Sequence, residues 1–213
     1  MLGLGVAKTR DPERDSYHHG NLSETLVKSA IEIIGGSGLG SLSLRALARH
    51  AGVSPAAPYR HFPSRDALLE AIAVQGFRIR SENMHLALEK AGSDPMARLL
   101  EVGVAFVLFA HEYASHYAVM TNAELIEDSQ DTELAEAAAK SMGILLQAMR
   151  EAQDAGCIAS GDVKVLAAAA WASVHGLASL IASGQLRHLR IESENVEELT
   201  RRITGAMLGV MAS

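Results

Sequence analysis

The sequence predicts an all-α fold, with an N-terminal three-helix head, a C-terminal helical bundle and about nine helices in total. Of the 213 residues, 48% are hydrophobic but only 4% are aromatic. This composition favours helices over a β-sandwich and supplies a sizeable core. Apolar residues recur at three- and four-residue spacing along most of the chain. Glycines and prolines separate these periodic segments, and none of the segments predicts a convincing strand.

The head contains the pattern of a helix-turn-helix. A first helix is predicted over residues 21–36, and a run of glycines ends it. A second helix starts after Ser43, a suitable N-cap, and ends at Gly52 in the C′ position. Ser54 then caps a third, short helix that ends near Phe62. A helix, a glycine turn and a short helix together predict the helix-turn-helix arrangement.

The helices of the bundle are longer. Asp94 is a suitable N-cap, and Pro95 suits the first helical position, where its missing N–H is not needed. The segment 102–110 is apolar on nearly all sides, which is typical of a helix buried inside a bundle. The predicted helices cover about 65–90, a segment from 95 onward, 113–126, 132–155, 163–183 and 196–212.

Charge is distributed unevenly between the head and the rest. The net charge of the chain is −6, but residues 1–65 carry eight Lys and Arg against five Asp and Glu, a net charge of +3. We therefore expect only the head to meet an anionic partner. The N-terminus has no run typical of a signal peptide, and the longest apolar run, 102–110, is too short to span a bilayer. These features predict a cytoplasmic protein without a membrane partner.

The head resembles the N-terminal DNA-binding domain of the TetR family of bacterial transcriptional regulators. The resemblance covers residues 17–72 and rests on three motifs in order: YHHGNL at 17–22, SLRALARHAGVS at 43–54 and YRHFPSRDALL at 59–69. The C-terminal part resembles the family mainly in the length and pattern of its helices. In addition, WASVHG at 171–176 is similar to a Trp-x-x-x-His-Gly element of one C-terminal subclass.

This resemblance implies a homodimer that binds a palindromic DNA operator and responds to a small-molecule effector, with no cofactor. It implies a flexible arm over residues 1–16 and a helix-turn-helix domain over 17–65, with a lever helix from 65 to about 90. A ligand-binding and dimerisation domain follows over 93–213. Ligand binding is expected to move the lever helix, and the recognition helix with it.

The resemblance also implies the residues that contact DNA. Phosphate contacts are expected near Ser43, and Tyr59 can both pack its ring and place its hydroxyl on a phosphate. The family usually has a polar residue or threonine at the position of Ala57, but an alanine can still contact a thymine methyl. Pro55 and Pro58 predict a short, rigid recognition helix. The candidates are Ser43, Arg45, Ser54, Ala56, Ala57, Tyr59, Arg60, His61 and Arg65.

The candidate ligand pocket is a group of aromatic, methionine and histidine side chains, each of which could instead be plain core. As a group they predict an apolar or aromatic ligand with one or two polar handles. Trp171 and His175 could alternatively lie in a dimer contact. The candidates are Phe106, Phe109, Tyr113, His116, Tyr117, Met120, Met142, Trp171 and His175.

The last two predicted helices carry the expected dimer interface. Small residues on the first of them allow close helix approach, and an apolar stripe lies on the second. The candidates are Ala168, Ala172, Leu199, Ile203, Met207 and Val210.

An enzyme is not expected. His111 and His116 are spaced i, i+5 rather than the i, i+4 of a zinc-protease helix, and no nucleophile or carboxylate pair stands out. We expect no metal site. The alternative to a ligand-responsive repressor is a helical ligand-binding or protein-interaction module whose head has little or no sequence-specific DNA binding, because the recognition segment is poor in polar side chains.

Overall fold

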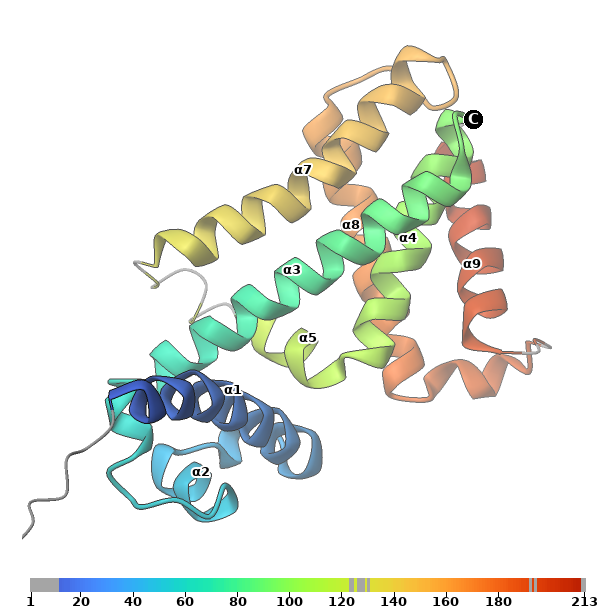
Figure 1. Cartoon of the computed structure of the whole chain (residues 1–213). Coiled ribbons are helices and arrows are strands. Elements are labelled where there is room, and N and C mark those ends of the chain that lie inside the picture. Colours follow the sequence, from blue (N-terminus) through green and yellow to red (C-terminus); the bar gives the residue numbers. More distant parts are fainter. Residues whose placement is uncertain are drawn as a thin grey trace, which may run out of the picture. The chain divides into compact units, whose positions relative to one another are not determined.

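The structure is a computed structural model that describes residues 12–122, 125, 129, 131–191, 193 and 195–211, with the backbone alone for 12–21 and 211. Eight α-helices and three short 3-10 helices, without a strand, account for the regular structure of these residues (Figure 1). This confirms the all-α prediction. The chain divides into two compact units, Met1–Leu68 and Leu69–Ser213, which we call the head and the body. The division falls within helix α3 (Arg65–Ala91).

The head begins with a helix that is longer than the sequence predicts. Helix α1 starts at Pro12 rather than near residue 21, so it includes residues 12–16 of the expected arm; residues 1–11 lie outside the described part. Leu26, Ala30 and Ile34 form its buried stripe. The elements of the head are α1 (Pro12–Ser37), η1 (Leu39–Ser41), α2 (Leu44–His50), η2 (Pro58–Arg60) and the first turn of α3.

The glycine turn after α2 agrees with the prediction. Gly52 has a φ of 67°, in the left-handed region that glycine adopts without strain. Its N–H donates to the Arg49 carbonyl at 3.3 Å, and the N–H of Val53 donates to the Ala48 carbonyl at 3.0 Å. These two bonds close the end of α2 and reverse the chain toward the recognition segment.

The predicted recognition helix is not a regular α-helix. Residues 55–57 form a turn, and only the 3-10 helix η2 follows. The N–H of Ala57 donates to the Ser54 carbonyl at 2.9 Å, a three-residue spacing. Pro58 has no N–H with which to donate to that carbonyl in the α-helical pattern, so the tighter turn prevails. The prediction of an α-helix from Ser54 to Phe62 was therefore wrong in type, although its position is correct.

The body is built around α4, which packs against α7, α8 and α9 (Figure 1). Its apolar middle is buried, as expected from the sequence. The predicted helix over 113–126 is shorter: α5 ends at Met120, and Thr121 caps it. The elements of the body after α3 are α4 (Pro95–Glu112), α5 (Ala114–Met120), α7 (Thr132–Asp154), α8 (Val163–Ala182), η3 (Gln185–Leu189) and α9 (Val196–Met211).

Side-chain caps fix the starts of the body helices. Asp94 accepts hydrogen bonds from the N–H groups of Met96 and Ala97 at 2.9 and 3.2 Å. Asp162 accepts from Lys164 at 2.8 Å in the same way. These contacts satisfy N–H groups that have no partner within the helix, and the contacts of Asp94 confirm the cap that the sequence predicts there.

Helix α8 is unusual because it is apolar yet largely exposed. Among the described residues it is the one helix whose length and hydropathy would allow it to cross a membrane, a test that helices packed inside soluble proteins also pass. Only Ala167, Val174, Leu177 and Ala178 are fully buried in it. Val165, in contrast, is 64% exposed. One face of this helix therefore offers apolar surface for a further contact.

Candidate functional site

The head presents several of the predicted DNA-contacting residues to solvent. Tyr59 is 51% exposed, so its hydroxyl is available. Arg45 and Arg60 are exposed, as are Ser54 and Ala56. These side chains can reach an external partner without rearrangement of the head.

Ser43 serves the fold of the head as well as its surface. Its hydroxyl accepts from the N–H of Ala46 at 3.1 Å, which makes it the N-cap of α2, as predicted. The side chain remains exposed. His61, another candidate, is half-buried between η2 and α3.

Two of the residues predicted to contact DNA, Ala57 and Arg65, make contacts within the head. Ala57 is only 9% exposed, and Pro58 after it is buried. The methyl group of Ala57 therefore packs within the head, and the prediction that it approaches bases is not supported. Exposed Ala56 is the alanine of this segment that can do so.

Arg65, the second of these residues, holds the head together. Its Nε donates to the carbonyl oxygen of Leu42 and its Nη2 to that of Leu39, each at 3.1 Å. Both carbonyls belong to the segment that precedes α2. The guanidinium also lies 3.6 Å from the Asp66 carboxylate. We therefore assign Arg65 first to the support of this segment, because charged donors to backbone carbonyls form strong hydrogen bonds.

The body contains a cavity of about 690 Å³, of the size that holds small-molecule ligands. Five predicted ligand residues line it. Helices α3, α5, α7 and α8 contribute its walls, which are mostly apolar. Its lining consists of Phe77, Arg80, Tyr117, Met120, Thr121, Ala138, Ala139, Met142, Trp171, Ala172 and His175.

A polar pair stands on the wall of this cavity. The hydroxyl of Tyr117 and Nδ1 of His175 share a hydrogen bond of 2.5 Å. The other ring nitrogen, Nε2, is buried and has no hydrogen-bond partner among the described residues. Burial lowers the pKa of His175, and the positive charge of Arg80 lowers it further, so the imidazole is neutral at neutral pH. Burial raises the pKa of Tyr117, which keeps its hydroxyl protonated.

Aromatic rings surround His175. The centroid of its ring lies 4.9 Å from that of Phe106 and 5.0 Å from that of Trp171, both edge to face. Trp171 is 41% exposed. Trp171 and His175 both lie on the wall of the cavity, and their contact with a ligand stays a prediction.

Arg80 is a charged residue of the cavity lining that was not predicted from the sequence. Its side chain is 7% exposed, and its Nε donates to Ser141 Oγ at 2.9 Å. The guanidinium carbon lies 4.9 Å from the ring centroid of Phe77 and 5.2 Å from that of Phe106. Burial lowers the pKa of Arg80 to about 10, which still leaves it charged at neutral pH. A signal existed in the sequence: Arg80 falls within the buried stripe of α3, between Phe77 and Met84.

Three predicted ligand residues belong to the core beside the cavity rather than to its lining. Phe109 is fully buried and stacks on Tyr113, with ring centroids 5.4 Å apart. His116 is 6% exposed, and its Nε2 is hydrogen-bonded to Gln75 Oε1 at 3.2 Å. Their assignment to the ligand site is therefore corrected to packing within the body. Gly76 allows this packing, since a Cβ there would lie 3.2 Å from the Cβ of His116.

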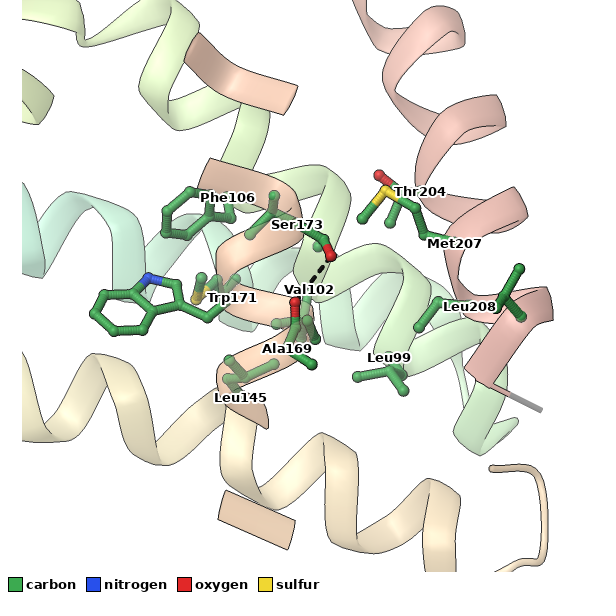
Figure 2. A pocket seen from close by; sticks show the side chains of 15 residues that line it. Leu99, Val102, Phe106, Leu145, Ala169, Trp171, Ser173, Thr204, Met207 and Leu208 are labelled. Carbon is green, nitrogen blue, oxygen red and sulfur yellow. Dashed lines mark hydrogen bonds between the residues drawn. The ribbon is translucent and has the colours of Figure 1, made fainter. Parts of the chain in front are cut away.

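A second, smaller cavity of about 300 Å³ lies between α4, α8 and α9. Figure 2 shows Phe106 and Trp171 on one side and Thr204, Met207 and Leu208 of α9 on the other. Its lining is almost wholly apolar. Met207 and Val210, two predicted dimer residues, belong to this lining.

The other predicted dimer residues also lie on accessible faces of α8 and α9. Ala168 and Ala172 are exposed on α8, and Ala172 borders the main cavity. Leu199 and Ile203 are half-buried on α9, whereas Val210 is 76% exposed. The two helices also contact each other.

The histidines do not assemble a metal centre. His116 and His175 are hydrogen-bonded to Gln75 and Tyr117, respectively, and His111 is exposed. No group of three potential ligands occurs among the residues that the structure describes.

Comparison with protein families places both units. Residues 26–72 match the family described as "Bacterial regulatory proteins, tetR family". Residues 99–207, more than half of the chain, match "Tetracyclin repressor-like, C-terminal domain". The chain belongs to the tetR family of bacterial regulatory proteins. It is accordingly a DNA-binding transcription regulator and not an enzyme, in agreement with the sequence analysis.

Several solved structures share the fold of this chain. A protein with unknown function from Rhodococcus sp. RHA1 is 34% identical, with a TM-score of 0.77 over 96% of this chain and 100% of that chain. The TetR family transcriptional regulator PfmR from Thermus thermophilus is 19% identical, with a TM-score of 0.68 over 86% of this chain and 93% of its own. A tetR-family regulatory protein from Rhodococcus RHA1 is 18% identical, with a TM-score of 0.65 over 89% and 94%. No curated protein matches the sequence. The Trp-x-x-x-His-Gly subclass remains a prediction.

Proposed function

We propose that this regulator is a cytoplasmic, dimeric repressor that a small, largely apolar molecule releases from a palindromic operator. The observation that carries the proposal is the position of the cavity on α3. Phe77 and Arg80 of this helix line the cavity, and Arg65 at its start holds the carbonyls of Leu39 and Leu42 in the head. A ligand that shifts α3 thus acts on a helix that continues into the head, which couples the affinities for ligand and DNA reciprocally.

The exposed face of the head supports the DNA contacts. We assign phosphate contacts to Ser43, Arg45 and Tyr59, and contacts near the bases to Ala56 and Arg60, all of which are exposed. The 3-10 form of η2 presents a shorter surface than a regular recognition helix. Arg60 and Ser54 therefore carry most of the polar contacts with bases, and shape readout carries the rest.

The exposed apolar face of α8 and α9 supports a homodimer. Val165, Leu180 and Val210 are 64%, 38% and 76% exposed, a surface that a second copy would cover through a two-fold contact. Met207 and Val210 of α9 also line the smaller cavity, so a partner that covers them would lie beside this cavity. The predicted interface residues Ala168, Ala172, Leu199 and Ile203 lie on the same two helices.

The experiment measures binding to DNA from upstream of the protein's own gene against a shuffled duplex, by fluorescence anisotropy at several salt concentrations. We expect tighter binding to the upstream DNA, and light scattering should give the mass of a dimer. Tyr59→Phe should weaken binding to both duplexes and leave the log-log salt slope nearly unchanged, because a neutral hydroxyl displaces no counterion from a phosphate. Arg60→Ala should weaken binding to the upstream duplex more than binding to the shuffled duplex. Equal, weak binding of both duplexes by the unaltered protein would instead favour the interaction-module alternative.

A further inference from the structure

The main cavity holds a buried positive charge without a carboxylate. Arg80 is 7% exposed, and no Asp or Glu among the described residues forms an ion pair with it. Other arginines of the body do have such partners: Arg78 pairs with Glu133, and Arg98 with Glu151 at 2.8 Å. Arg80 is therefore buried but lacks the neutralising partner that more exposed arginines have.

The contacts that Arg80 does make compensate for its burial only in part. Ser141 accepts one hydrogen bond from Nε, and the rings of Phe77 and Phe106 face the guanidinium carbon. A guanidinium carries five N–H donors, and its two Nη groups have no acceptor among the described residues. The free donors form a planar fork that matches the two oxygens of a carboxylate.

The rest of the cavity determines what can be attached to that carboxylate. Met120, Met142 and Trp171 give it apolar walls, and Ala138 and Ala139 leave space between them. The unpartnered Nε2 of His175 adds one polar contact on the wall. A multiply charged ligand such as a nucleotide phosphate would meet only one cation here, and it would bury its remaining charge against apolar side chains.

We propose that the ligand of this cavity is a small molecule with a single carboxylate and an apolar body, and that its carboxylate pairs with Arg80. Its apolar body packs against Phe77, Met142 and Trp171, and His175 can hold a polar substituent. The inference rests on the proposed function only where it makes this ligand the effector. The carboxylate site itself is defined by Arg80 and the cavity lining.

Trp171 makes the test specific to the site, because it is the single tryptophan of the chain and lines the cavity. Its fluorescence is recorded while the full-length protein is titrated with straight-chain carboxylates from hexanoate to dodecanoate and with 2-naphthoate. Each acid is compared with its neutral primary amide. The same titrations are made on Arg80→Met, on Arg80→Lys and on Arg78→Met. Arg78 is a matched control, since it is an arginine of the same helix that is exposed, paired with Glu133 and outside the cavity lining.

We expect at least one carboxylate to bind the unaltered protein at least about tenfold more tightly than its amide, as a buried charge-assisted pair requires. Arg80→Met should abolish this preference, Arg80→Lys should retain part of it, and Arg78→Met should leave it unchanged. The proposal is overturned if no carboxylate changes the Trp171 signal. It is equally overturned if amides bind as well as acids, or if the preference survives in Arg80→Met.

A parallel measurement of DNA release separates this inference from the proposed function. Release of the upstream DNA by a carboxylate, dependent on Arg80, supports both. Binding that depends on Arg80 but leaves DNA affinity unchanged upholds the carboxylate site and contradicts its effector role. If amides and acids release DNA equally, from the unaltered protein and from Arg80→Met, the protein is a ligand-responsive repressor. The proposal that a carboxylate pairs with Arg80 is then contradicted.

Discussion

The head and the body use an arginine of the same helix in opposite ways. In the head, the guanidinium of Arg65 donates to the carbonyl oxygens of Leu39 and Leu42, and its side chain is 37% exposed. In the body, the guanidinium of Arg80 is 7% exposed and donates to Ser141 alone among the described residues. Arg65 therefore stabilises the segment around it, whereas Arg80 remains available to an anion at the expense of stability. Binding sites commonly sacrifice stability in this way.

The largest expected effect tests the structural role of Arg65 and is a loss of stability in the head. Arg65→Met removes two charge-assisted hydrogen bonds and leaves two carbonyl oxygens without these donors. We expect the free energy of opening of the head to fall by about 2–3 kcal/mol, somewhat below the sum for two such bonds because the side chain is partly exposed. Amide hydrogen exchange of α2 measures this opening directly.

The same variant also decides between the two roles of Arg65. If Arg65 supports the fold, amide hydrogen exchange of α2 is faster in Arg65→Met, and DNA binding weakens for every sequence. Unchanged exchange, together with a reduced salt slope for DNA binding, would show instead that Arg65 contacts a phosphate, and the contrast with Arg80 would then disappear.

A smaller effect of opposite sign is expected in the body. Arg80→Met replaces a buried charge that lacks a carboxylate with an apolar side chain of similar length, and such replacements are neutral or stabilising. We expect the free energy of unfolding of the ligand-free protein to rise by about 1–2 kcal/mol. Urea unfolding followed by Trp171 fluorescence measures it, with Arg78→Met as the control. A destabilised Arg80→Met protein would mean that the cation-π contacts with Phe77 and Phe106 outweigh the burial of the charge.

Several helix ends could be predicted from the sequence because local rules determine them. Ser43, Gly52 and Asp94 mark such ends through caps and a positive φ, which depend on a few neighbouring residues. The recognition segment was predicted less well for an equally local reason. Pro58 removes one α-helical hydrogen bond, and this was enough to produce a 3-10 helix in place of an α-helix.

The cavity could be predicted only in part, because it depends on how distant helices meet. Tyr117, Met120, Met142, Trp171 and His175 were recognised by residue type and do line it. The same residue types at Phe109 and His116 pack in the core beside it, and sequence spacing does not separate the two cases. Arg80 was not predicted, because the candidates for the cavity were chosen among aromatic, methionine and histidine side chains. Its neighbours Phe77 and Met84 are both buried, and this was the available signal.

The smallest effect concerns pH and the two buried histidines of the body. Burial lowers the pKa of His116 and of His175 below the ordinary value of 6.5, so the unfolded chain takes up protons as the pH falls through 6.5 while the folded body does not. Stability is therefore present above pH 6.5 and is lost below it, by up to about 1 kcal/mol for each histidine at pH 5.5.

Melting curves at pH 7.5 and 5.5 should show this loss, and His116→Gln should reduce it. Arg80→Met should reduce it as well, because the positive charge of Arg80 is the second cause of the lowered pKa of His175. An equal acid-induced loss in all three proteins would place the titrating groups outside the body's buried histidines and would remove the electrostatic link between Arg80 and His175.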